Sequence, residues 1–443
     1  MNPTTQTPID YQVVNKMIRE CGLESIGKAS IRDVVKLVNE IEKYTGEKFI
    51  RMEMGVPGLE PPEIAIEGEI KALKKGVASK YPMIDGIEPL KNEISRFIKN
   101  FMNLSVNPEN CLPTVGAMQA SFAGFMVSCR RDPEKDTTLF IDPGFPVQKE
   151  QHRVLGLKYK NFDVYNYRGD RLRDKLESYL KKGNISTIIY SNPNNPSWIC
   201  LNEKELKTIG ELATKYDVVV LEDLAYFGMD FRHDISTPGE PPYQPTVANY
   251  TDNYVLLISS SKSFSLAGER IGMMAISDSL FQRKFPGLKR FFPTEQFGYS
   301  MTHGALYTLS AGANHSAQHG LLEILKAVNE GRYNFVEGVR EYAKRAKVMK
   351  RLFQKYGFNL VYSKDEDQPL SDGFYFTISF PGMEGHELLA ELIYYGISAI
   401  TLDITGSERT EGLRACVSQV SMDQMDDLEY RLKRFQEDHL KSV

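Results

Sequence analysis

The sequence predicts an α/β protein with a mostly parallel central sheet and a second, smaller α+β domain. Two observations support this prediction. Between residues 110 and 260, short apolar runs alternate with amphipathic segments, which is the pattern of βαβ units. Each apolar run also ends in polar side chains, as strands do when their carboxyl ends form the ligand-binding edge of a parallel sheet.

Four of these runs are predicted to be buried strands. They are apolar at nearly every position, as expected when helices cover both faces of a parallel sheet. They span residues 138–141, 187–190, 218–221 and 255–258. A connecting helix is predicted over 203–215, because Leu206, Ile209 and Leu212 recur at helical spacing.

The smaller domain is predicted from the C-terminal third of the chain. A helical pattern over 336–353 leads into it, followed by strands at 374–380 and 413–417 and a helix at 386–395. Residues 31–44 predict a further helix. The predicted organisation is an N-terminal segment joining the small domain (1–54), a large cofactor-binding domain (55–318), and a connecting helix with the small C-terminal domain (319–443).

Composition excludes several classes of protein. The chain has 443 residues, 42% of them hydrophobic, and its net charge of −4 argues against nucleic-acid binding. Its five cysteines are far apart and favour reduced thiols. No apolar run approaches the ~18 residues of a membrane span, and the first twelve residues lack the pattern of a secretory signal. We therefore expect a cytoplasmic protein that binds neither nucleic acid nor membrane.

Lys262 directly follows the predicted strand 255–258, in the stretch SSSKSFSLAGER. By spacing alone, a solvated surface lysine is the commoner case. Burial beside the strand and the nearby cation Arg270 would both lower the pKa of the lysine, which would make its amine an imine-forming nucleophile. A phosphate-loop lysine is excluded, because no GxxxxGK[ST] precedes it.

Two further elements predict an anion site. The guanidinium of Arg270 can grip a phosphate in two places, and Ser259 and Ser261 can donate hydroxyl hydrogen bonds. Gly116 opens an apolar helix whose N-terminus would offer free N–H groups. By itself, this glycine is equally typical of a plain loop.

The other strand ends carry groups suited to a flat aromatic ligand. Asp223 suits a protonated ring nitrogen, Tyr226 and Asn195 suit a ring hydroxyl, and Phe145 offers a face for stacking. Each residue also has a structural interpretation. Asp223 could be a helix cap, Asn195 part of an Asn-Pro turn, and Phe145 a core residue.

A phosphate cup, a carboxylate, a stacking aromatic and a lysine together describe pyridoxal 5′-phosphate. With SxSKxFxxxGxRxG, NPNNP and ExDxAY in this order, the sequence resembles the class I/II (fold type I) aminotransferases from about Gly55 to Arg414. The resemblance implies that Lys262 holds the cofactor as an imine and moves the proton. It implies a phosphate cup of Gly116, Ala117, Met118, Ser259, Ser261 and Arg270, with Asp223 on the ring nitrogen, Asn195 and Tyr226 on the ring hydroxyl and Phe145 stacked on the ring.

Three more residues match the family outside the cofactor motifs. Arg414 is expected to clamp the α-carboxylate of the substrate, Asn195 is expected to bind the substrate as well, and Gly55 belongs to a loop that closes over the substrate. Tyr81 is expected to reach the phosphate of a neighbouring subunit, which implies a homodimer. No metal is implied.

The resemblance implies amino-group transfer between an L-amino acid and a 2-oxo acid. A β-carbon–sulfur lyase or a decarboxylase on the same scaffold stays an alternative. A cofactor-binding sensor domain of a transcription regulator is disfavoured, because the first ~50 residues lack room and basic charge for a DNA-binding domain. Two features depart from the family: Ser197-Trp198 replaces the usual Thr-Gly, and the Pro-rich loop 236–246 has no functional interpretation.

Overall fold

The computed structural model describes residues 7–440. The first six and last three residues, at the ends of the predicted N-terminal segment and of the small domain, lie outside this range. The chain divides into two compact units. The larger contains Leu59–Asn195 and Ile199–Val339, and the smaller contains the chain up to Gly58, Pro196–Trp198 and the chain from Arg340.

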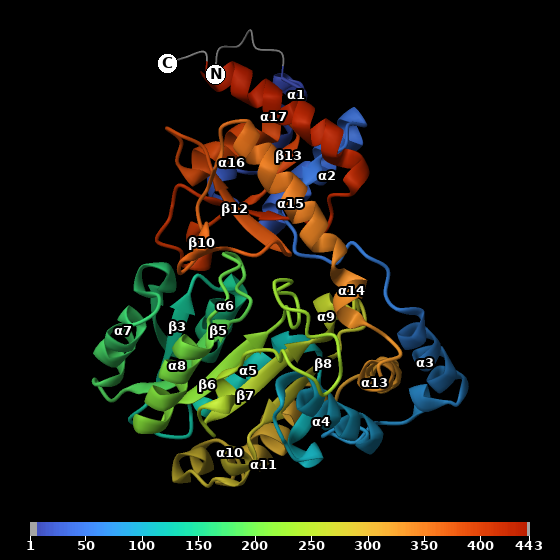
Figure 1. Ribbon diagram of the computed structural model, residues 1–443, viewed down its shortest axis with the longest axis vertical. Helices are drawn as coiled ribbons and strands as arrows, with labels where there is room; N and C mark the ends of the chain where they lie inside the picture. Colours follow the sequence, from blue (N-terminus) through green and yellow to red (C-terminus); the bar gives the residue numbers. More distant parts are fainter. Residues whose placement is uncertain (1–6, 441–443) are drawn as a thin grey trace. The chain divides into compact units, whose positions relative to one another are not determined.

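The larger unit is built on a seven-stranded sheet of order β2-β8-β7-β6-β5-β3-β4 (Figure 1). Its strands are β2 (Cys111–Thr114), β3 (Thr137–Asp142), β4 (Lys158–Asp163), β5 (Ile185–Ser191), β6 (Val219–Leu224), β7 (Tyr254–Ser259) and β8 (Gly272–Ile276). Strands β3 to β7 pair in parallel, whereas β8 runs antiparallel to both β2 and β7. This mostly parallel sheet confirms the predicted fold class.

Helices cover this sheet and extend the unit. They are α3 (Glu63–Lys74), α4 (Glu88–Met102), α5 (Gly116–Ser128), α6 (Pro146–Leu155), α7 (Arg171–Leu180), α8 (Glu203–Lys215), α9 (Ser260–Ser263), α10 (Asp278–Gln282), α11 (Phe297–Tyr299), α12 (Tyr307–Ser310), α13 (His315–Asn329) and α14 (Phe335–Val339). The predicted boundary between residues 318 and 319 falls inside α13, which packs on α3 and α4 of the larger unit.

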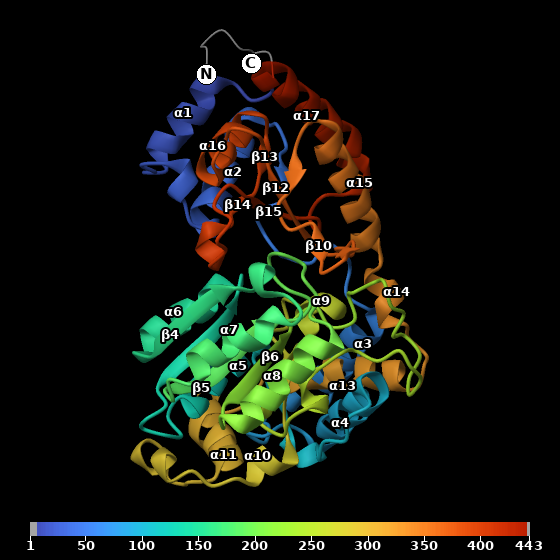
Figure 2. The same ribbon diagram turned by 60° about the vertical axis from the view of Figure 1, so that its left-hand side comes forward.

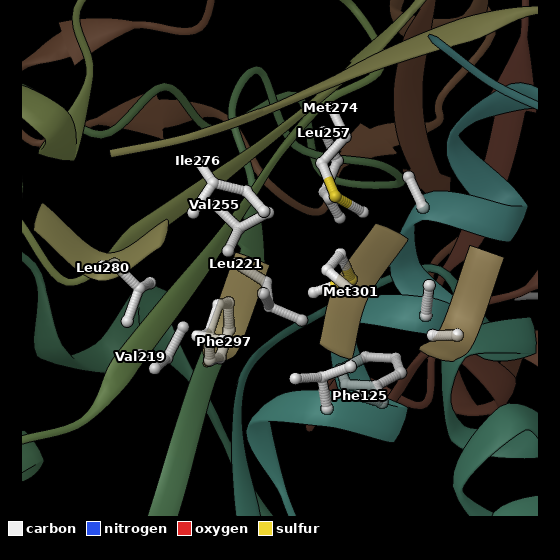
Figure 3. Packing of buried hydrophobic residues seen from close by; sticks show 14 of the residues in the cluster. Phe125, Val219, Leu221, Val255, Leu257, Met274, Ile276, Leu280, Phe297 and Met301 are labelled. Carbon is white, nitrogen blue, oxygen red and sulfur yellow. The ribbon is translucent and has the colours of Figure 1, made fainter. Parts of the chain in front are cut away.

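The core of the larger unit lies between the sheet and α5. Figure 3 shows side chains of the central strands, among them Val219, Leu221 and Val255, gathered where Phe125 of α5 and Met301 lie. Each such fully buried side chain stabilises the fold by about 1.5–3 kcal/mol. Successive side chains of a strand point to opposite faces of the sheet, so Val219 and Leu221 lie on the face of β6 that is turned toward α5.

Helix α8 packs against β6 and occupies the residues predicted for the connecting helix (Figure 2). Asn202 caps it, since its side chain accepts a hydrogen bond from the N–H of Glu205 and the Glu205 side chain bonds back to the cap. The buried residues of α8 include Leu206, Ile209 and Leu212, as the helical spacing predicted.

The smaller unit contains a four-stranded antiparallel sheet of order β14-β15-β12-β9. Its strands are β9 (Asn359–Leu360), β12 (Tyr375–Ser379), β14 (Ile400–Thr401) and β15 (Leu413–Cys416), and short pairs join β1 (Ile50–Arg51) with β13 (Ile397–Ser398) and β10 (Lys364–Asp365) with β11 (Gln368–Pro369). Its helices are α1 (Tyr11–Glu20), α2 (Ile31–Thr45), α15 (Glu341–Lys355), α16 (Gly385–Tyr394) and α17 (Met425–Leu440). Helices α15 and α17 lie side by side (Figures 1 and 2).

The helical pattern predicted over 336–353 is divided between two helices, α14 and α15, with Arg340 between them. Phe335 of α14 packs on the rings of Phe97 and Phe101 in the larger unit, whereas α15 packs on β12 of the smaller unit. The pattern breaks because its two parts bury their apolar faces in different cores. Within residues 7–440, no helix combines the length and the apolar character needed to cross a membrane.

Candidate active site

Three strand ends of the larger unit bring candidate residues to one edge of the sheet. Asn195 follows β5, Asp223 lies near the end of β6, and Lys262 follows β7. These strands are adjacent and parallel, so their carboxyl ends lie together.

Asp223 is a buried carboxylate held by neutral groups. The side-chain Nε2 of Gln148 donates to its Oδ2 at 2.8 Å, and the N–H of Ala225 donates to its Oδ1 at 3.1 Å. Burial raises the pKa of Asp223 to about 6, although both hydrogen bonds act to lower it. A turn rather than a helix follows it, so Asp223 is not a helix cap.

Gln148 was not predicted from the sequence. It lies in the first turn of α6, which begins at Pro146, and Phe145 is the N-cap residue of that helix. Its position one turn beyond the predicted stacking residue Phe145 is the signal that would have found it. Phe145 is half-buried rather than part of the core.

Hydrogen bonds fix the loop that carries Asn195. The N–H of Asn195 donates to the Ser191 hydroxyl at 3.2 Å, and the amide of Asn194 donates to the carbonyl of Pro143 at 2.7 Å. The loops after β3 and β5 are thereby tied together. Asn195 and Tyr226 are both buried, at 6% and 3% exposure.

Arg270 lies against the N-terminus of α5, where both elements could contact an anion. A Cβ atom at Gly116 would lie 2.7 Å from Nη2 of Arg270, so the guanidinium lies directly against the first residue of the helix. Gly116 also has φ +68°, which favours glycine. A Cβ at Gly272 would come within 3.1 Å of the N of Ala117, so this glycine lets β8 approach the helix N-terminus. Met118 completes the first turn.

The serines around Lys262 form two kinds of hydrogen bond, to distant backbone carbonyls and within their own turn. Ser260 donates to the carbonyl of Ile271 at 2.5 Å and Ser263 donates to the carbonyl of Phe227 at 2.7 Å, which anchors the short helix α9. Ser259 accepts from the N–H of Ser261 at 3.1 Å. Lys262 is half-buried on this anchored turn.

In the smaller unit, Arg414 and Gly55 lie against the same tyrosine. Arg414 is buried on β15, donates from Nη2 to the carbonyl of Glu53, and has its guanidinium 4.7 Å from the centre of the Tyr375 ring. A Cβ at Gly55 would lie 2.0 Å from the hydroxyl oxygen of Tyr375. Tyr375 was not predicted as a site residue; its position at the start of the strand in GFYFTI would have suggested it.

Trp198 is buried and contacts residues of the smaller unit. Its ring is 1% exposed, its Nε1 donates to the Ser371 hydroxyl at 3.0 Å, and its edge meets Tyr375 at a centroid distance of 6.2 Å. Its φ is +63°, a conformation that glycine adopts more readily. Trp198 therefore keeps the left-handed backbone conformation that glycine, the usual residue of the family at this position, adopts easily.

Tyr81 lies on the surface of the larger unit, unlike the buried candidates Asn195 and Tyr226. It follows a short 3-10 helix, Val77–Ser79, and its side chain is 93% exposed. Within the described part of the chain, no cluster of three or more His, Cys, Asp or Glu side chains could hold a metal ion.

Residues 47–432 match the family described as "Aminotransferase class I and II". The chain belongs to this family. The aminotransferase is 26% identical over 339 residues to the "Probable aspartate aminotransferase" of Methanocaldococcus jannaschii, a match that covers 72% of this chain and 85% of the relative. It is 24% identical to the "LL-diaminopimelate aminotransferase" of Natranaerobius thermophilus, covering 70% and 76% of the two chains.

The fold of the aminotransferase agrees with solved structures. The alanine aminotransferase from Pyrococcus furiosus superimposes with a TM-score of 0.75 at 19% identity, covering 92% of this chain and 97% of that one. The predicted fold, enzyme class and pyridoxal 5′-phosphate cofactor are confirmed. The relatives and the solved structure named above are aminotransferases, which supports this activity over a lyase, a decarboxylase or a sensor domain.

The larger unit of the aminotransferase fits its cofactor. The Gly116–Arg270 surface and the N–H groups of α5 suit a phosphate. Asp223 is a buried carboxylate whose raised pKa marks a place where a positive charge would be stabilising, as a protonated ring nitrogen is. These two features are chemically different, and pyridoxal phosphate has a matching group for each.

Proposed function

We propose that this aminotransferase moves an amino group between an L-amino acid and a 2-oxo acid, with Lys262 as the residue that holds the cofactor and moves the proton. The observation that carries the proposal is Asp223, a buried carboxylate with two neutral hydrogen-bond partners. It favours the protonated form of a ring nitrogen, and that charge is what amine transfer requires of the cofactor.

When bound, pyridoxal phosphate supplies an aldehyde and an electron-withdrawing ring that acidifies the Cα–H bond of an amino acid. The protein supplies position and proton transfer. Lys262 Nζ takes the proton from the substrate Cα, and Asp223 keeps the ring nitrogen protonated. Asn195 and Tyr226 bond the ring hydroxyl, and Phe145 stacks on the ring.

Phosphate and substrate are held by separate groups. The first-turn N–H groups of α5 (Gly116, Ala117, Met118), the hydroxyls of Ser259 and Ser261, and Arg270 hold the phosphate. Arg414 binds the α-carboxylate of the substrate through its planar guanidinium, and its packing on Tyr375 supports that orientation. The loop that contains Gly55 closes over the substrate.

We also propose a homodimer in which Tyr81 reaches the phosphate of the partner's site. Tyr81 and Met83 are exposed, at 93% and 70%. A subunit interface would bury these large apolar side chains. All five cysteines are free thiols, which supports a cytoplasmic location.

A half-reaction assay tests the proposed function. The cofactor-loaded protein should be mixed with single amino acids, including aspartate, alanine and diaminopimelate, and the cofactor absorbance followed. At least one donor should convert the aldehyde form to the amine form, and a 2-oxo acid should restore it. Release of ammonia or carbon dioxide instead would indicate a lyase or a decarboxylase.

Borohydride reduction tests the role of Lys262 without an activity measurement. Reduction of the cofactor-loaded protein followed by peptide mapping should find the pyridoxyl group on Lys262. A pyridoxyl group on another lysine, or none in a loaded sample, contradicts the assignment.

A further inference from the structure

The smaller unit contains a pocket of about 420 Å³ outside the residues proposed to bind cofactor or substrate. Helix α15 forms one wall with Lys347, Lys350 and Arg351. Other lining residues are the almost fully buried aromatic residues Trp198, Tyr362 and Tyr375, the last of which also packs on Arg414. Its volume lies within the range of pockets that hold small molecules.

The cationic wall is only partly neutralised by the protein. Lys347, Lys350 and Arg351 are three and four residues apart, so they share one face of α15, where like charges repel. Lys350 pairs with Asp372 at 3.0 Å, and Asp372 is the one carboxylate that lines the pocket. Lys347 and Arg351 are exposed and form no ion pair or hydrogen bond with any residue of the described range 7–440.

One acidic side chain of the neighbouring helix α17 is already engaged. Glu429 of α17 accepts a hydrogen bond from the Tyr356 hydroxyl at 2.9 Å and forms an ion pair with Lys355 at 2.5 Å. Arg351 lowers the pKa of Glu429 less than Lys355 and Tyr356 do. The pocket therefore keeps three cations beside one carboxylate.

We propose that this pocket is a second ligand site, which binds a small molecule carrying two or more carboxylate or phosphate groups. Lys347 and Arg351 would make charge-assisted hydrogen bonds to the anionic groups, with the guanidinium gripping one of them in two places.

Hydrogen bonds link Lys350 to Trp198, which itself lines the pocket. Lys350 donates to the carbonyl of Ser371 at 3.0 Å, and the Ser371 hydroxyl accepts from Trp198 Nε1 at 3.0 Å. An anion that draws Lys350 toward it will change the surroundings of the indole. Trp198 is the only tryptophan in the chain, so its fluorescence reports on occupancy.

The experiment titrates cofactor-loaded protein with inorganic pyrophosphate and, in a second arm, with citrate. Loading the protein first fills the phosphate cup, so that pyrophosphate cannot bind there. Trp198 fluorescence and titration calorimetry are measured in parallel for wild type, Lys347→Gln/Arg351→Gln and Lys344→Gln. Lys344 is the matched control, since it is an exposed lysine of α15 that does not line the pocket.

Saturable binding of at least one probe is expected in the wild type and in Lys344→Gln. The dissociation constant should rise about tenfold or more in the double variant, since two charge-assisted contacts are lost. The arm that binds shows whether phosphate or carboxylate is preferred. No saturable binding by calorimetry up to about 10 mM of either probe, or equal affinity in the double variant, overturns the proposal.

Discussion

Glu222 and Asp223 are neighbours on β6, and strand alternation directs their side chains to opposite faces of the sheet. Asp223 shares the α5 face with Leu221. Glu222 on the other face accepts hydrogen bonds from the hydroxyls of Tyr190 and Thr246 and from the N–H of Val247. Glu222 thus anchors the end of the Pro-rich loop 236–246. The sequence did not reveal this structural role of Glu222.

Replacing Glu222 should change how stability depends on pH. Burial raises the pKa of Glu222 from 4.5 to about 7, so its folded form retains a proton that the unfolded chain releases. Its stabilising contribution is present below about pH 4.5 and is lost as pH rises through 7. Relative to Glu222→Gln, the wild-type free energy of unfolding should fall by up to about 3 kcal/mol over this range.

Denaturant unfolding of both apoproteins between pH 4.5 and 8 measures this difference. Other groups titrate in both proteins and cancel in the comparison. A difference that is independent of pH would show that Glu222 is not protonated in the folded protein.

Replacing Asp223 should slow the reaction without unfolding the protein. Asp223→Asn keeps the size of the side chain and can accept only one of its two hydrogen bonds, and it removes the charge that holds the ring nitrogen protonated. The rate of the half-reaction should fall by about 100- to 1,000-fold, the usual cost of one electrostatic group in an active site. Stopped-flow absorbance measures the rate, and circular dichroism confirms the fold.

Glu222→Gln is the matched control for this experiment, because it alters the adjacent carboxylate on the opposite face. It should retain a rate near that of the wild type. A near wild-type rate in Asp223→Asn would refute the assigned role of Asp223.

At the scale of elements, the turn Pro196–Trp198 and the start of β12 fit one another. A Cβ at Gly373 would lie 2.1 Å from the Trp198 ring, so the backbone before β12 approaches the indole too closely for any other residue. Burial of the indole offsets the left-handed backbone at Trp198, which costs about 1–2 kcal/mol. The departure from the family's usual Thr-Gly is therefore matched by a glycine on a distant segment.

Gly373→Ala should lower the free energy of unfolding by about 1–3 kcal/mol through overpacking. Adding Trp198→Ala should relieve this cost, and a double-mutant cycle by denaturant unfolding measures the coupling. Gly268→Ala is the control, because no atom lies within 4 Å of its added Cβ. If Gly373→Ala changed the free energy of unfolding equally with and without Trp198→Ala, the added methyl group would not be in contact with the indole.

At the scale of the whole molecule, we expect the active site to belong to a dimer. Tyr81→Asp would set a carboxylate against the partner's phosphate, and Lys262→Ala removes the amine from its own site. Each homodimer should be nearly inactive. Mixed dimers, made by unfolding and refolding the two variants together, should regain activity, because one site combines an intact Lys262 with the partner's intact Tyr81.

The control mixes each variant with itself through the same refolding. If Tyr81 acted within its own subunit, neither site of a mixed dimer would be intact. Activity that stays absent in mixtures, with dimers verified by size-exclusion chromatography, would therefore contradict the proposal.

The amino-acid sequence alone determined the features that depend on local order. Buried strands such as 255–258 were predictable because apolar runs reflect burial directly, and Lys262, Asp223 and Asn195 because side chains placed just after parallel strands meet at one edge. The bounds of α8 were predictable because its cap and its apolar period lie within one segment.

Tertiary structure alone decided which distant residues meet. Gln148 and Asp223 are 75 residues apart in the chain, and Trp198 and Ser371 are 173 apart, so no local pattern contains both members of either pair. The pKa of Asp223 follows from the burial that such partners create, and the break between α14 and α15 follows from the two cores that receive them. Periodicity specifies which face of an element is buried, whereas only packing specifies against what.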